Sequence, residues 1–211
     1  MTRPNIGEAD CLKKLEEICE PDARYKDRKV YDLERHEIRL LTIEDFYRNV
    51  EELKLHDGVP DDVFIEFEKA RNLYLYTWFV YRLGQVAELQ AYASLELALR
   101  VRHGGGTKKK LQRLLTHAVK HGWIRDEGFS GYREKMKRRQ ETIDGLSQII
   151  PDYAEKIKPA KPGGYVRMLS AILPKMRNRL AHGSTLLHPG IHNTLEICCE
   201  IINQLFEPPK S

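Results

Sequence analysis

The stretch QVAELQAYASLELALRVR, residues 85–102, consists mostly of Ala, Leu, Glu and Gln, with no Gly or Pro. These residue types have high helix propensity. Apolar side chains recur every three or four residues and form one stripe: Val86, Leu89, Ala93 and Leu97. His103 and the three glycines that follow it are typical of a helix end. The pattern predicts a helix over 85–102 that turns this stripe toward a core.

Helical patterns continue on both sides of this stretch. Apolar residues step at helical spacing between residues 63 and 81, at Val63, Phe67, Ala70, Tyr74, Thr77 and Tyr81. Three further helices are expected over 132–150, over 164–182 with Pro174 inside, and over 192–206. Another amphipathic helix, after a possible cap at Thr107, carries Leu111, Leu114, Leu115 and Ala118. Strand-like alternation is nearly absent. We therefore predict an all-α fold, a bundle of four or more helices over residues 62–206.

The residues before the bundle are predicted to form an acidic, helical N-terminal arm, residues 1–61. Thr42 and Asp45 have the spacing of a capping box, which predicts a helix that begins after Thr42. His56, Asp57 and Gly58 are expected to end it. Residues 207–211 remain as a short C-terminal tail.

Composition favours a globular protein of the cytoplasm. The longest apolar run, LYLYTWFVY at 73–81, is shorter than the roughly 18 residues that a membrane span needs. The first residues contain no apolar segment typical of a secretory signal. The four cysteines form no CxxC pair, so we expect reduced, buried thiols, with no metal site. No cofactor motif is present either, and no cofactor is expected.

Charge is distributed unevenly along the chain. Residues 1–62 contain 11 Lys and Arg against 17 Asp and Glu, whereas residues 63–211 contain 24 against 14. A basic segment of this kind favours a polyanionic partner, and we expect RNA. The expected RNA-binding residues are Lys108, Lys109, Lys110, Arg113, Lys175 and Arg179.

The stretch PKMRNRLAHGSTLLHP, residues 174–189, combines Arg177, Asn178 and His182 just before Gly183. On a regular helix Arg177 and His182 differ by roughly 140° in direction, so they do not share a face. Asn178 and His182 are one turn apart, and the amide could orient the imidazole. Two copies of the helix that meet about a two-fold axis would combine Arg and His around one phosphate.

Residues 62–206 resemble the HEPN superfamily, whose members are helical bundles with an Arg-x4-6-His motif in which a polar residue often follows the Arg. Here the motif is Arg177-Asn178-x3-His182, and AYASLELALRVR looks like the family's core. The resemblance implies a metal-independent endoribonuclease with a composite site in a homodimer. His182 would act on the ribose 2′-hydroxyl, Arg177 would stabilise the phosphoryl charge, and Asn178 would position either one. Such domains often act as toxins or antiviral effectors that an antitoxin or another regulatory protein restrains.

Several alternatives stay open. The main alternative is a non-catalytic HEPN-like module that binds nucleic acid, a nucleotide or a protein. Glu96 and Arg100, four residues apart, form either an ordinary ion pair or a support for the site. His117 and His121 are expected to be a solvent-facing pair. A three-histidine site of His182 with His188 and His192 is the less favoured interpretation.

Overall fold

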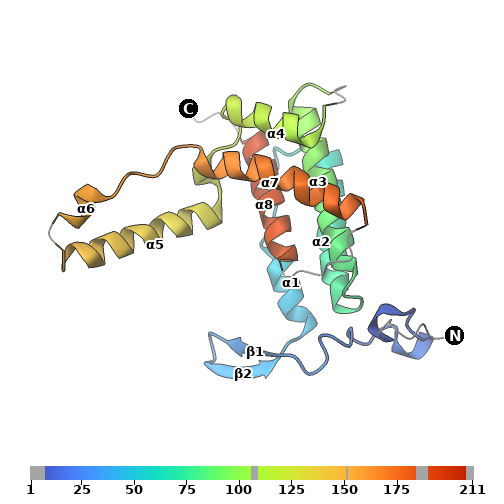
Figure 1. The fold of residues 1–211 in the computed structure, drawn as a ribbon. Coiled ribbons are helices and arrows are strands. Elements are labelled where there is room, and N and C mark those ends of the chain that lie inside the picture. Colours follow the sequence, from blue (N-terminus) through green and yellow to red (C-terminus); the bar gives the residue numbers. More distant parts are fainter. Residues whose placement is uncertain (1–7, 106–108, 151, 184–189, 208–211) are drawn as a thin grey trace.

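The computed structural model describes residues 8–105, 109–150, 152–183 and 190–207. The described chain is mostly helical, with one small two-stranded hairpin, which confirms the all-α class (Figure 1). The helices are α1 (Ile43–Glu51), α2 (Asp61–Leu75), α3 (Leu83–Arg102), α4 (Leu111–Lys120), α5 (Ser130–Ser147), α6 (Tyr153–Lys156), α7 (Gly164–Ala181) and α8 (Ile191–Phe206). Short 3-10 turns cover Glu8–Asp10, Leu15–Glu17, Tyr76–Trp78 and Asp126–Gly128.

Helix α3 lies at the centre of the fold and packs against α2, α8, α4 and α7. The buried side of α3 carries Ala87, Ala91, Tyr92, Leu95, Ala98 and Leu99. The stripe predicted from the sequence is only partly turned inward: Val86 is 47% exposed and Ala93 is also exposed, whereas Leu89 and Leu97 are half-buried and Leu97 packs against the core. The fully buried face was missed because apolar residues lie all around this helix, so periodicity alone could not select the inward face.

Small side chains explain which face of α3 is buried. Ala87, Ala91 and Ala98 are fully buried and let neighbouring helices approach closely. The same face also buries the carboxyl group of Glu88, which accepts a hydrogen bond of 2.7 Å from the Thr194 hydroxyl on α8. A buried polar group needs such a partner, so this bond also fixes how α8 sits on α3.

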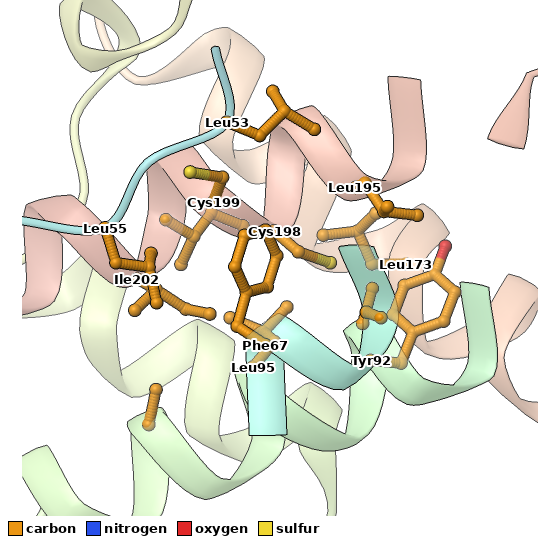
Figure 2. Close-up of a cluster of buried hydrophobic side chains, with 14 of the residues drawn as sticks. Leu53, Leu55, Phe67, Tyr92, Leu95, Leu173, Leu195, Cys198, Cys199 and Ile202 are labelled. Atoms are coloured by element: carbon orange, nitrogen blue, oxygen red, sulfur yellow. The ribbon is translucent and has the colours of Figure 1, made fainter. Parts of the chain in front are cut away.

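The main core lies where α2, α3 and α8 meet (Figure 2). Phe67 of α2 and Leu95 of α3 project into it together with Leu195 and Cys198 of α8. Burial raises the pKa of the Cys199 thiol to about 12, so this thiol is inert at neutral pH. The expectation of four buried cysteines holds only for the pair Cys198 and Cys199, because Cys11 and Cys19 are exposed.

The N-terminal arm is not wholly helical, contrary to the prediction. Residues Lys29–Asp32 (β1) and Glu37–Leu40 (β2) form an antiparallel hairpin, with Val30 opposite Arg39. Arg39 donates hydrogen bonds to Asp32 and to Asp45, which joins the hairpin to α1. Asp45 also accepts a bond from the Thr42 backbone amide, so the predicted capping box is present. Sequence periodicity missed the hairpin because each strand has only four residues.

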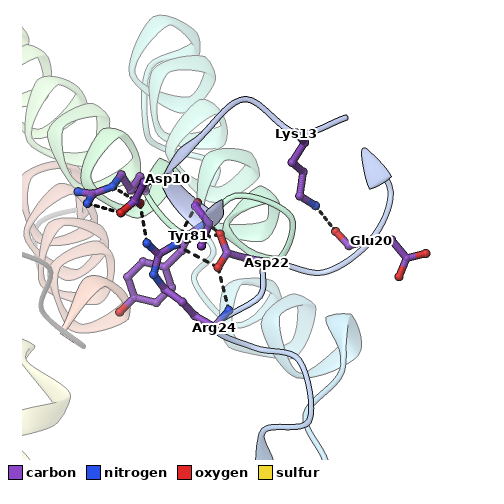
Figure 3. Close-up of polar contacts among 8 residues, drawn as sticks. Asp10, Lys13, Glu20, Asp22, Arg24 and Tyr81 are labelled. Carbon is purple, nitrogen blue, oxygen red and sulfur yellow. Dashed lines mark hydrogen bonds and ion pairs between the residues drawn. The ribbon is translucent and has the colours of Figure 1, made fainter. Parts of the chain in front are cut away.

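Residues before position 62 share the core of the bundle. Their buried side chains are Tyr25, Phe46, Val50, Leu53, Leu55 and Val59. Near the start of α3, Asp10 pairs with Arg24 and Arg82, while the Asp22 carboxylate accepts a bond of 2.9 Å from the backbone amide of Tyr81 (Figure 3). The boundary expected at residue 61 therefore does not separate two cores.

Helices α5 and α6 project away from the body as a pair (Figure 1). No residue of α5 is buried, and α5 contacts mainly α6 and the turn Asp126–Gly128. Among the described residues, none of the helices combines the length and the apolar character needed to cross a bilayer.

We expect Phe67→Ala to lower the free energy of unfolding by about 3–5 kcal/mol, because the ring is fully buried and its loss leaves a cavity. Urea denaturation followed by circular dichroism measures the change. Phe64→Ala is the matched control on the same helix, where the ring is 43% exposed, and it should cost less than about 1 kcal/mol. If both variants lost the same free energy of unfolding, Phe67 would not lie in the buried core described above.

Candidate functional site

A basic hollow of about 360 Å³ lies between the last turns of α3, the start of α4 and the end of α7. Glu96 and Arg100 border it from α3, and Pro174 borders it from α7. Pro174 is buried inside α7. The hollow therefore lies where three helices converge, and its walls come from segments that are far apart in the sequence.

Glu96 links two arginines that border the hollow. Its side chain is 10% exposed, and each carboxylate oxygen accepts a hydrogen bond from a different arginine. Arg100 Nη2 lies 2.6 Å from Glu96 Oε1, and Arg177 Nη2 lies 3.0 Å from Glu96 Oε2. Because a desolvated carboxylate is costly unless it is paired, this arrangement fixes both guanidinium groups and joins α3 to α7. Two positive charges against one negative charge leave the cluster cationic.

Arg177 and Asn178 border the hollow from α7. The Arg177 side chain is 36% exposed, so its ion pair with Glu96 leaves part of the guanidinium open. Its Nη1 is 3.4 Å from the Asn178 amide oxygen. The Asn178 amide thus contacts the arginine, whereas the sequence suggested a contact to the imidazole of His182.

His182 lies just after α7 and is exposed. Its backbone angles, φ −89° and ψ 11°, depart from the helix, and Gly183 follows with φ +81°, as the glycine cap predicts. His182 borders the same hollow as Arg177. The two residues were expected to point apart on one helix, but the helix end and the length of the arginine side chain bring both to one hollow within a single chain.

The predicted RNA-binding residues fall into two groups. Lys109 and Lys110 border the hollow at the start of α4. Lys108 and the possible cap Thr107 lie outside the described residues. Arg113 of α4 and Lys175 and Arg179 of α7 are exposed but are not among the residues that border the hollow.

The structure gives no support to a metal site of His182, His188 and His192. The Nε2 atom of His192 lies 2.9 Å from the backbone oxygen of Asn49, on the side of α8 that faces α1. His188 lies outside the described residues. No group of three His, Cys, Asp or Glu suited to a metal ion occurs in the part of the chain that the structure describes.

His117 and His121 are not simply two solvent-facing side chains. Their rings stack with centroids 3.9 Å apart. The ring of His103, at the end of α3, lies 4.7 Å from His117, and Trp123 lies 5.1 Å from it. The spacing of HAVKH indicates only that His117 and His121 are neighbours. The contacts of His103 and Trp123 with this pair could not be predicted from the sequence.

No protein-family model, curated protein or solved structure matches the chain. Function is therefore inferred from the side chains around the hollow.

We expect the Glu96–Arg177 pair to show a coupling free energy of about 0.5–3 kcal/mol in a double-mutant cycle of Glu96→Gln and Arg177→Gln, measured by urea denaturation. The coupling should be substantial because the carboxylate is largely shielded from water. Glu134 and Arg138 on α5 are the matched control, with side chains 62% and 74% exposed. Their cycle should give at most about 0.5 kcal/mol. A Glu96–Arg177 coupling no larger than that of the control would mean that the ion pair does not join α3 to α7.

Proposed function

We propose that this protein is a metal-independent endoribonuclease of the HEPN type. The observation that carries the proposal is the placement of Arg177, Asn178 and His182 around one hollow that Lys109 and Lys110 also border. A phosphate group suits such a hollow, because arginine forms charge-assisted and often bidentate bonds to phosphate oxygens. The proposal is consistent with the resemblance of residues 62–206 to that superfamily.

Arg177 is suited to stabilise charge in the transition state. Its contact with Glu96 fixes the guanidinium before the substrate arrives, and such preorganisation makes an electrostatic contribution effective. Arg100 is held by the same carboxylate, and its Nε has no hydrogen-bond partner among the described residues. In this mechanism Arg177 contacts the phosphate oxygens and Glu96 is a positioning residue.

His182 is suited to move protons, since it is exposed at the rim of the hollow. A neutral imidazole accepts the proton of the ribose 2′-hydroxyl while the 2′-oxygen attacks the adjacent phosphorus. The bond from phosphorus to the 5′-oxygen breaks, and that oxygen receives a proton from a general acid. The products are a 2′,3′-cyclic phosphate and a free 5′-hydroxyl.

We further propose that two copies meet with their hollows facing, so that one phosphate contacts the Arg177 of one copy and the His182 of the other. The exposure of the two side chains supports this, because Arg177 is 36% exposed and His182 is exposed at the hollow, where a second copy can reach both. A self-complementary contact of this kind is typical of two-fold dimers.

The biological role proposed is that of a toxin or an antiviral effector under the control of another protein. The acidic N-terminal residues are anchored at the first turn of α3, through Arg82. The hollow begins at Glu96, about 20 Å further along the same helix. This separation favours the arm as a docking surface for a partner over a mask on the hollow of its own chain.

A second candidate function is binding without cleavage, either of a nucleotide or of RNA. The specific observation in its favour is that Arg177 is already paired with Glu96, which reduces the charge available for the transition state. The purified protein would then retain RNA in the hollow but leave it intact.

We expect His182→Ala to reduce cleavage of single-stranded RNA by about a hundred- to ten-thousand-fold, the usual contribution of general acid-base catalysis. The rate is measured on a labelled oligoribonucleotide with EDTA present. The matching deoxyoligonucleotide should stay intact, since it lacks the 2′-hydroxyl.

The control for folding is the melting temperature, which should hardly change because His182 is exposed. Cleavage that persists undiminished in His182→Ala, or that requires added magnesium, would refute this mechanism. Binding of RNA by wild type and variant alike, with no cleavage by either, would support the second candidate.

Mixing the Arg177→Ala and His182→Ala proteins should restore roughly a quarter of the wild-type activity, because about half of the dimers are then mixed and each mixed dimer holds one complete site of two. Activity is measured after co-refolding, and light scattering checks that dimers form. Dimers that form without restored activity would show that each chain holds a complete site.

A further inference from the structure

A ladder of aromatic rings lies next to the hollow. His121 stacks on His117 with ring centroids 3.9 Å apart, and the His103 ring lies 4.7 Å from that of His117. Trp123 meets His117 edge to face at 5.1 Å. His121 is exposed, and His103, His117 and Trp123 are half-buried, so the ladder forms part of the surface.

Hydrogen bonds hold two of these rings in place. Lys109 Nζ lies 2.9 Å from His103 Nε2, and since an ammonium group only donates, Nε2 must accept and carries no proton. His121 Nδ1 lies 2.9 Å from the His117 carbonyl oxygen, so Nδ1 donates. Desolvation lowers the pKa of His117, and positive charge on the neighbouring histidines and on Lys109 and Lys120 lowers it further. This lowered pKa favours the neutral form of the His117 ring at neutral pH, and Trp123 adds an uncharged π face.

Cations surround these faces. The Arg102 guanidinium lies 5.4 Å from the centre of the Trp123 ring, and Lys109 and Lys120 lie beside the imidazoles. Flat aromatic surfaces interspersed with positive side chains are the usual means of binding single-stranded nucleic acid, because bases stack on the rings while phosphates pair with the cations. A metal ion fits less well, since a lysine and a backbone carbonyl already hold nitrogens of His103 and His121.

Lys109 links the ladder to the hollow. It borders the hollow together with Arg177 and His182, and it also bonds to His103. A strand with one phosphate in the hollow thus has the ladder as the adjoining surface.

We propose that His117, His121 and Trp123 form a stacking platform for the bases of single-stranded RNA next to the hollow. This inference rests on the proposed function and adds a preference for unpaired RNA. A duplex keeps its bases stacked inside and cannot use the platform.

The test follows the fluorescence of Trp123. The chain contains two tryptophans, and Trp78 lies at the other end of α3, stacked on Tyr25. In a Trp78→Phe protein, Trp123 is the sole reporter. The probe is a 12-nucleotide 2′-O-methyl oligouridylate, which has no free 2′-hydroxyl and cannot be cleaved by the proposed mechanism. Binding should quench the fluorescence in a saturable way, whereas a duplex of the same length and polyphosphate should not.

His121→Ala should weaken binding of the probe by roughly 5- to 150-fold, the usual effect of losing one stacking partner. His121→Phe should retain the affinity, because a phenyl ring also offers a π face. His36→Ala, at an exposed position of the N-terminal hairpin, is the matched control and should bind like the parent.

Three results would overturn the platform: the absence of quenching, unchanged affinity in His121→Ala, or equal quenching by the duplex. The catalytic proposal fails separately. Quenching by the probe without cleavage of unmodified RNA would support the platform and refute the ribonuclease. Cleavage of unmodified RNA with none of the expected stacking effects would support the ribonuclease and refute the platform.

Discussion

The buried carboxylate of Glu96 is the constraint on which the site depends. Glu96 lies on the side of α3 that packs against other helices, so its charge must find partners within the protein. Arg100 supplies one from the next turn of α3, and Arg177 supplies the other from α7. The pairing that stabilises the packing of α7 on α3 is thus the same pairing that orients the arginine of the candidate site.

The hollow and the ring ladder form one continuous surface around the end of α3. Arg177 and His182 border the hollow, His103 and His117 belong to the ladder, and Lys109 touches both. The proposed chemistry and the proposed preference for unpaired RNA therefore depend on separate side chains. The two can be separated experimentally even though they lie side by side.

In the N-terminal residues the sequence pattern revealed one local structure, a capping box, but not the β-hairpin before it. The capping box at Thr42 and Asp45 was visible because it depends on two residues three positions apart. The hairpin that precedes it was not visible, because strands of four residues give too short an alternation. Its attachment to α1 depends on Arg39, which bonds to both Asp32 and Asp45.

The sequence by itself determined the helical class, the order of the main helices, and the stripes of α2 and α4, because these follow from local propensity and clear periodicity. The motif Arg177, Asn178 and His182 was also visible. Only the tertiary structure decided which face of α3 is buried, since small residues on that face matter through the close approach of neighbouring helices. The Glu96–Arg177 pair and the contact of Lys109 with His103 likewise appear only on folding, because each joins residues from different elements.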